Sequence, residues 1–328
     1  NPSYYNPDIL GVHTLTWKYD DGTDNTKTYK DMVAGDITNA GLNTATLEIA
    51  KADGLFDEYA YVSDTDATAF TEWMNVNRQA YANFNDANVA VSTMTEDQKT
   101  LANAAMRNVH FRRAVMYSID RATMVAQRKG EDLKYNCMIN AYVPGNFVYL
   151  SKEVTVDING ESVTFPAGTA YGTIRQRQLE ADGSTMKTYD EETGLGTGFD
   201  GWYNPEAANA ELAIAIEELA AQGYEISAEN PVYLDIASFT GNDSFKNQDQ
   251  ALKQSVENVL GGVVIVNIVP CDTQKDWLNA TYYPNTGAEM NFNIGNNGGW
   301  GPDYGDPKSY LDTLLPGGNG MTKSFGLF

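Results

Sequence analysis

Residues 232–269 read VYLDIASFTGNDSFKNQDQALKQSVENVLGGVVIVNIV, which combines two strand patterns with a helix pattern between them. Apolar residues recur at every second position from Val232 to Ile236, as in a strand. Residues 244–260 have the apolar spacing of an amphipathic helix that ends at Gly261-Gly262. Residues 263–269 are almost continuously apolar, which is typical of a buried strand. This strand–helix–strand order predicts a parallel pair of strands covered on both faces, and therefore an α/β fold.

The sequence that follows predicts where a ligand would bind. A helix is expected over Gln274–Ala280 and a strand over Glu289–Ile294, and the glycine-rich stretch Gly295–Trp300 is expected to be a loop. Ligands of open α/β sheets bind beyond the carboxyl ends of the strands. We therefore expect the binding site at this loop.

Helices are also predicted on the amino-terminal side of this unit. Asn204 and Pro205 are typical of a helix start, and Gly223 would end that helix. A helix is expected from Asn108, and Asp120 would cap the next helix, with Gly130 at its end. We expect the two to meet at a corner.

Four further segments have weaker patterns. In residues 12–19 the side chains alternate in the period of two that is typical of a strand. A short helix is predicted for residues 28–34, and short strands are expected around residues 44–49. Between residues 151 and 202 the chain is polar and rich in glycine, and Asn159-Gly160 predicts a two-residue hairpin turn. This fourth segment is expected to be surface β structure and loop.

Composition excludes several classes of function. The 328 residues carry 44 acidic and 22 basic side chains, a formal charge of −22, which repels nucleic acid and anionic lipid. No apolar run approaches the roughly 20 residues of a membrane helix. The chain does not begin with an export signal, so such a signal is expected to have been removed or to be absent from this sequence.

Cysteine and histidine give little indication of chemistry. Cys137 and Cys271 are compatible with either free thiols or a bond between them. His13 and His110 are isolated in the sequence and lack partners for a metal site. No nucleophile elbow, zinc-protease motif or phosphate loop is present. We therefore expect no catalytic residue, no metal and no cofactor.

Two blocks resemble the family 5 extracytoplasmic solute-binding proteins, the oligopeptide and dipeptide receptors of ABC importers. FRRAVMYSIDR at 111–121 is similar to the family pattern hRxAhxYAIDR, and WGPDYGDP at 300–307 is similar to W-x-x-D-Y-x-D-P. Supporting similarities are NPSYY at 1–5, AGDI at 34–37 and NPEAA at 204–208. The resemblance extends over nearly the whole chain and is weakest over 151–202.

The resemblance implies a class II periplasmic-binding-protein fold, with two lobes of mixed sheets flanked by helices. By this mapping residues 1–78 belong to the first lobe, with the crossover near Trp73–Asn77. Residues 79–328 form the second lobe, with the β-rich polar insertion at 151–202. Compared with the family pattern, the chain is expected to be a fragment lacking the N-terminal part and the final return strands.

The resemblance also implies an extracytoplasmic function and a set of ligand-binding residues. The expected function is to bind oligopeptides in an interlobe cleft and deliver them to a membrane permease. The protein would be a monomer, lipid-anchored or periplasmic, with no enzymatic activity. Its ligand residues would be Asp303 for the peptide ammonium, Trp300 as an aromatic wall, and Tyr304, Asn297 and Gly299. Some relatives have a carboxylate-binding Arg at the position of Asn297, so we expect tolerance of longer peptides.

Two alternatives remain open from the sequence. One is a different ligand of the same family: an oligosaccharide, a nickel chelate or a cell-wall peptide. The other is a glycoside hydrolase, because carboxylate pairs are plentiful but cannot be placed from the sequence.

Overall fold

A computed structural model describes residues 11–12, 14–20, 24–61, 67–190, 199–315 and 321–327. The chain divides into two compact units, Asn1–Ala60 and Tyr61–Phe328. Residues 61–78 thus group with the larger unit, whereas the lobe boundary at residue 78 stays a prediction. No helix in the described ranges is long and apolar enough to cross a membrane.

The smaller unit contains three helices, α1 (Lys27–Val33), α2 (Thr44–Ala52) and α3 (Phe56–Tyr59). Helix α1 confirms the short helix predicted there. The strand predicted for residues 12–19 is wrong, because the described residues of this segment form no strand. The side chain of Trp17 is 86% exposed. The segment 1–5 and His13 lie outside the described residues.

Helix α2 contradicts the strand prediction for residues 44–49. The side chain of Asn43 accepts a hydrogen bond from the Thr46 amide, and the Thr46 hydroxyl accepts one from the Asn43 amide. This capping box satisfies two amide groups at the helix start. Leu47 and Ala50, three residues apart, are both buried, which is the spacing of a helix. This spacing and the cap outweigh the strand preference of the β-branched residues in the segment.

The larger unit is built on a four-stranded mixed sheet in the order β1-β6-β4-β5. Its strands are β1 (Ala69–Met74), β4 (Val232–Phe239), β5 (Val264–Cys271) and β6 (Ile294–Trp300). Strand β4 is parallel to β5 and β6, whereas β1 is antiparallel to β6. Helix α9 (Asp243–Val259) connects β4 to β5. The predicted βαβ unit and the α/β class are therefore confirmed.

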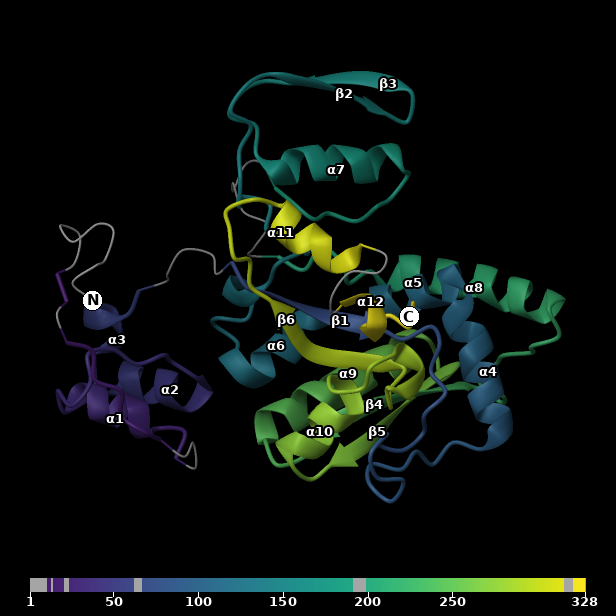
Figure 1. Ribbon diagram of the computed structural model, residues 1–328, viewed down its shortest axis with the longest axis horizontal. Helices are drawn as coiled ribbons and strands as arrows, with labels where there is room; N and C mark the ends of the chain where they lie inside the picture. Colours follow the sequence, from purple (N-terminus) through teal and green to yellow (C-terminus); the bar gives the residue numbers. More distant parts are fainter. Residues whose placement is uncertain are drawn as a thin grey trace. The chain divides into compact units, whose positions relative to one another are not determined.

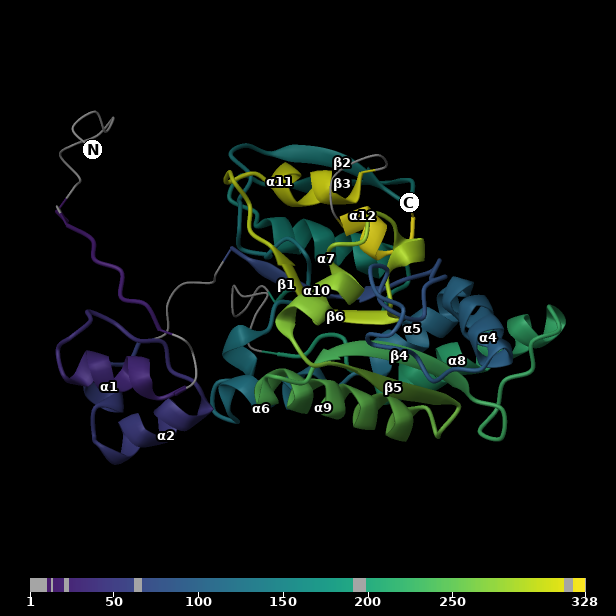
Figure 2. The ribbon, with the colours of Figure 1, turned by 60° about the horizontal axis from the view of Figure 1, so that its bottom comes forward.

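Helices cover both faces of this sheet (Figures 1 and 2). The larger core lies between one face and helices α4 (Glu96–Arg107), α5 (Val109–Ser118), α8 (Pro205–Ala221) and α9. On the other face, α10 (Gln274–Thr281) contributes to a smaller core with Trp73 and Phe292. The remaining short elements are α6 (Arg121–Lys129), η2 (Tyr135–Cys137), η3 (Gly287–Glu289), α11 (Lys308–Leu311), η4 (Asp312–Leu314) and α12 (Met321–Ser324).

The predicted helix starts are confirmed by cap geometry. Asn108 accepts from the Phe111 amide, Asp120 from the Thr123 amide and Asn204 from the Ala207 amide. Helix α6 ends at Gly130, whose φ of 82° lies in the region that favours glycine. These contacts form within a few residues, which is why the sequence alone could predict them.

The polar segment contains the predicted hairpin and one unpredicted helix. Strands β2 (Val154–Ile158) and β3 (Glu161–Phe165) are antiparallel, and the turn has φ values of 52° at Asn159 and 85° at Gly160. Both values match a type I′ turn. Helix α7 (Tyr171–Ala181) corrects the expectation of only β structure and loop. Its buried residues are Gly172 and Leu179 alone, so the sequence has little apolar periodicity there.

Side chains from α9 bind one backbone unit on the outer edge of β5. The amide of Val266 donates to Glu257 at 3.0 Å, and the ammonium of Lys253 donates to the Val266 carbonyl at 2.7 Å. Lys253 and Glu257 are also paired with each other at 2.5 Å. One backbone unit of the edge therefore has the partners that a neighbouring strand would otherwise provide.

Candidate functional site

The predicted binding loop is the strand β6. Gly295 pairs with Trp73, and Trp300 pairs with Ala69, so the stretch expected to be a loop is antiparallel to β1. The strand predicted over residues 289–294 is wrong: Glu289 ends the turn η3, and β6 begins only at Ile294. The partner strand β1 lies more than 200 residues earlier in the chain, so the pairing had no local signal.

Strand β6 nevertheless ends where a ligand site was expected. Ile294 pairs with Ile236, and β4 ends at Phe239, so the last residues of β6 continue past the carboxyl end of β4. The same residues remain paired with β1. The two strands therefore form a ribbon that extends beyond the central strand and leads to Asp303, and we call this pair the β1–β6 ribbon.

The glycines of the ribbon allow close packing inside the protein. A Cβ at Gly298 would lie 1.8 Å from Cζ2 of Trp73, and a Cβ at Gly299 would lie 2.8 Å from Cδ1 of Phe70. Both distances are shorter than real Cβ contacts, so a side chain at either position would force neighbouring atoms to move. The described structure thus gives these glycines a packing role, in addition to the close ligand approach expected from the sequence.

Trp300 anchors the segment that carries Asp303. Its indole nitrogen donates to the Ser309 carbonyl at 2.9 Å, and its partly buried ring packs against the small core around Tyr310. The Tyr310 hydroxyl in turn donates to the carbonyl of Ala67, just before β1. The loop after β6 is therefore tied at both ends to the start of the ribbon.

Asp303 and Tyr304 lie in this loop and face solvent. Asp303 is exposed, and Tyr304 is 76% exposed. The nearby Asp306 accepts from the Lys308 amide and so has a structural partner. Asn297 lies in β6, but the position of its side chain is outside the described structure. Of the five predicted residues, Gly299 and Trp300 are adjacent on the ribbon, and Asp303 and Tyr304 follow in the exposed loop.

The sequence analysis missed Phe70 and Glu72. They lie on the same face of β1, since the register shift in the ribbon falls on β6. Phe70 is 67% exposed, whereas Oε2 of Glu72 is buried without a hydrogen-bond partner in the described structure. Burial and the nearby charge of Asp249 raise the pKa of Glu72 to about 8, and Arg121 acts in the opposite direction. The stretch AFTEWM at 69–74 has no apolar alternation, so nothing in the sequence pointed to these two residues.

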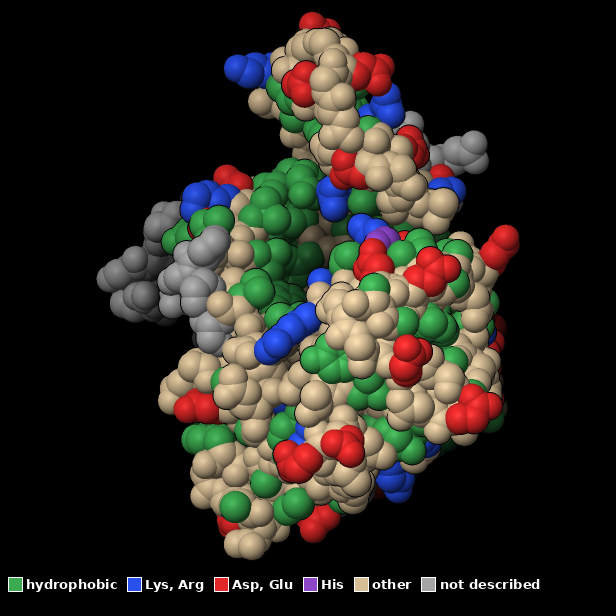
Figure 3. Space-filling model, turned by 90° about the vertical axis from the view of Figure 1, so that its right-hand side faces the viewer, with side chains coloured by type: hydrophobic (Ala, Val, Ile, Leu, Met, Phe, Trp, Pro, Cys, Tyr) green, Lys and Arg blue, Asp and Glu red, His purple; other side chains and the backbone are tan. Residues whose placement is uncertain are grey.

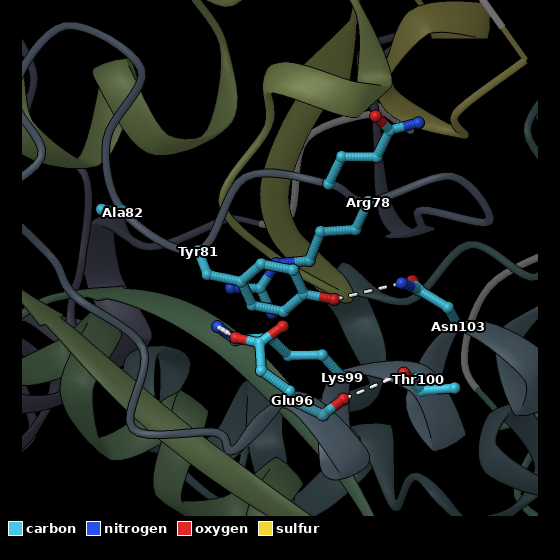
Figure 4. Close-up of a pocket in the computed structure, with 8 residues that line it drawn as sticks. Arg78, Tyr81, Ala82, Glu96, Lys99, Thr100 and Asn103 are labelled. Atoms are coloured by element: carbon cyan, nitrogen blue, oxygen red, sulfur yellow. Dashed lines mark hydrogen bonds and ion pairs between the residues drawn. The ribbon is translucent and has the colours of Figure 1, made fainter.

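A separate polar pocket of about 600 Å³ lies beside α4 (Figure 4). Tyr81 is at its centre, with the Arg78 guanidinium 4.2 Å and the Lys99 ammonium 4.6 Å from its ring centroid. Asn103 donates to the Tyr81 hydroxyl at 3.2 Å. Both cations have carboxylate partners, Asp235 for Arg78 and Glu96 for Lys99. The pocket is therefore a set of internally paired charges.

The surface view in Figure 3 shows a hollow lined with hydrophobic side chains below the uppermost part of the molecule, which carries the β2–β3 hairpin.

Among the described residues, no group of three or more His, Cys, Asp or Glu could hold a metal ion. Cys271 is a buried free thiol, which answers the question of its bonding left open by the sequence.

Comparison with known proteins gives a family match over nearly the whole chain. The model of the bacterial extracellular solute-binding proteins, family 5 Middle, matches residues 1–322. Oligopeptide-binding protein SarA of Streptococcus gordonii is 29% identical, with 99% of this chain and 44% of SarA covered. Oligopeptide-binding protein AliA of Streptococcus pneumoniae is 28% identical, with the same coverage of 99% and 44%. The chain thus spans less than half the length of these relatives.

Solved structures support the fold. The clavulanic acid biosynthesis oligopeptide binding protein 2 matches with a TM-score of 0.51 and 18% identity, covering 93% of this chain and 41% of that protein. This likeness agrees with the mixed sheet flanked by helices in the larger unit.

Proposed function

The chain belongs to family 5 of the bacterial extracellular solute-binding proteins, and from this membership we propose that it is part of the binding component of an ABC importer for oligopeptides. The observation that carries the proposal is the family match over residues 1–322. It is supported by the names of the relatives SarA and AliA, which are oligopeptide-binding proteins. The matched family consists of extracellular solute-binding proteins, so this protein acts outside the cytoplasm. The proposal includes delivery to a membrane permease, action as a monomer, a lipid-anchored or periplasmic location and no enzymatic activity.

Within this function, Asp303 is proposed to bind the α-ammonium of the peptide. Its carboxylate is exposed in a loop that Trp300 ties to the ribbon. When a second lobe closes over it and excludes water, a charge-assisted hydrogen bond contributes about 1.5 to 3 kcal/mol. Trp300 would line the site with the outer part of its ring, and Gly299, Tyr304 and Asn297 would contact the ligand next to it.

The proposed mechanism is closure of two lobes on the peptide, with the lobe boundary near residue 78. An extended peptide presents its ammonium and its backbone whatever its sequence, so a tolerant receptor binds these parts. Binding shifts the open–closed equilibrium only through contacts that are better in the closed state. Contacts from both sides of the cleft are therefore required.

The test is calorimetric titration of peptides into the full-length protein that contains this chain. Asp303→Asn removes the charge and should weaken binding of a free-amine peptide by about 10- to 100-fold, following from the energy above. N-acetylation of the peptide should weaken binding to the wild type and have little further effect on the variant. Asp306→Asn is the matched control, because asparagine can still accept from the Lys308 amide.

Equal affinities for free and acetylated peptides would refute the role of Asp303. Absence of binding for every peptide, together with binding of a glycan or a nickel chelate, would refute the choice of ligand within the family. A length series of peptides also tests the expectation from Asn297, since a sharp optimum at two residues would contradict tolerance of longer ligands.

A further inference from the structure

Residues 142–190 form an arm that carries β2, β3 and α7 and lies next to α11 (Figure 1). The chain before the arm is joined to the chain after it. Arg121 donates to the side chain of Asn140 and is paired with Asp200 at 2.6 Å. Asn140 in turn donates to the Phe199 carbonyl at 3.0 Å. The chain on both sides of the arm is therefore held at one hydrogen-bonded point.

The first residues of the arm are fixed to its helix. The amide of Tyr171 donates to the Val148 carbonyl at 3.0 Å, and the amide of Gly172 donates to the carbonyl of Gly145 at 2.8 Å. The two glycines permit this approach, because a Cβ on either of them would lie 2.3 Å from the ring of Tyr189. The start of the arm and α7 are therefore packed as one piece.

Two aromatic side chains at the start of the arm contact Tyr310 of α11. The rings of Tyr142 and Phe147 lie edge-on to the Tyr310 ring, with centroids 5.6 and 5.3 Å away. The Tyr142 hydroxyl is also 3.1 Å from the Thr313 hydroxyl, which donates to the Tyr310 carbonyl at 2.6 Å. Edge-on aromatic pairs are favourable beyond the area that they bury. The arm therefore helps to hold α11 in place.

The position of α11 determines where the loop with Asp303 ends. This loop runs from Trp300 to Ser309, and the Trp300 indole donates to the Ser309 carbonyl at 2.9 Å. Trp300 and Tyr310 pack in one small core together with Val143 of the arm. Asp303 is itself exposed, so its position depends on how the two ends of the loop are held.

We propose that Tyr142 and Phe147 are positioning residues for peptide binding. They hold Tyr310, and thereby keep Asp303 where its carboxylate meets the peptide ammonium. This inference rests on the proposed function and gives the arm a role in it. A hydrogen bond weakens when its distance and angle depart from the preferred values, so a displaced loop should lose part of its preference for a free amine.

The experiment measures, on the full-length protein, the ratio of the affinities for a free-amine peptide and for the same peptide after N-acetylation. Because both peptides are measured on one variant, loss of folded protein does not change the ratio. Tyr142→Leu keeps an apolar side chain without the ring and should lower the ratio about two- to tenfold, the factor that corresponds to one aromatic pair. Adding Phe147→Leu should lower it further. Tyr142→Phe keeps the ring and should keep the wild-type ratio.

The matched control is Tyr149→Leu, at a tyrosine of the same arm that is 58% exposed. This variant should keep the wild-type ratio. An unchanged ratio in the double variant, or an equal loss in Tyr149→Leu, would overturn the inference and leave the proposed function intact. A wild type that binds both peptides equally would overturn the role of Asp303 and this inference with it, whereas failure to bind any peptide would overturn the proposed function itself.

Discussion

Arg78 and Asp235 form a salt bridge of 2.8 Å in which both side chains are completely buried. Arg78 also donates to Asn291 and Asn293, each at 2.7 Å, and Ser92 donates to Asp235 at 2.5 Å. The segment after β1 is thereby joined to β4 and to the residues before β6. Burial of two charges is costly, and the network is favourable only when every partner is present.

Removing one member should leave an unpaired buried charge. Asp235→Asn is expected to lower the free energy of unfolding by about 3 to 5 kcal/mol. Urea denaturation followed by circular dichroism measures this loss. The double variant Arg78→Met, Asp235→Leu should be less destabilised than the single variant, and a single-variant loss below about 1 kcal/mol would contradict the network.

Glu72 should make the protein less stable as pH rises. Its pKa is about 8 in the folded protein and 4.5 as its ordinary value, so the folded state keeps a proton that the unfolded chain releases between these two pH values. The contribution of Glu72 to stability is therefore fully present below pH 4.5 and is lost as pH rises through about 8.

The test is Glu72→Gln, which cannot ionise. The variant should gain roughly 2 kcal/mol or more over the wild type between pH 5 and pH 8, since each unit of pKa corresponds to about 1.4 kcal/mol. Denaturant unfolding at both pH values measures this difference. Glu229→Gln, at an exposed position, is the control. Parallel pH profiles for wild type and Glu72→Gln would show that Glu72 ionises normally.

Gly298 should not tolerate a side chain. In Gly298→Ala the new Cβ would lie 1.8 Å from the Trp73 ring, so the ribbon or the indole has to move. We expect a loss of about 1 to 3 kcal/mol in thermal or urea unfolding. Gly305→Ala is the matched control, because a Cβ there meets nothing within 4 Å. Equal stability of the two variants would contradict the close packing of β6 on β1.

Cys271 should be unreactive in the folded protein. Burial and the neighbouring carboxylates of Asp276 and Asp272 raise the pKa of its thiol to about 12, and the thiolate is the reactive form. Iodoacetamide labelling, read by mass spectrometry of the peptide containing residue 271, should be slow at pH 8 and fast in denaturant. Fast labelling without denaturant would indicate that β5 opens locally.

Local patterns in the sequence predicted most elements that are stabilised by near neighbours. The caps at Asn108, Asp120 and Asn204 and the turn at Asn159 depend on contacts within a few residues. The βαβ unit was predictable because its two strands and its helix follow one another in the chain. Residues 44–49 form a helix and not the predicted strand, because the capping box of Asn43 and Thr46 starts a helix there.

The pairing of β1 with β6 was not predictable in this way. It joins segments more than 200 residues apart, and a glycine-rich stretch such as 295–300 has no side-chain alternation of its own. The role of Gly298 becomes visible only once Trp73 is placed beside it. For the same reason Phe70 and Glu72 were missed: their exposure and charge state depend on distant partners, whereas Asp303 and Trp300 were found through a resemblance to a family.

The two hydrogen bonds at Val266, on the outer edge of β5, bear on how copies of the chain meet at high concentration. Open strand edges are templates on which copies of a chain add to one another and aggregate. At Val266 the amide and the carbonyl already have partners in Glu257 and Lys253, and Pro270 on the same strand has no amide hydrogen to offer. Another copy of the chain that pairs at Val266 must therefore first displace the hydrogen bonds of Glu257 and Lys253.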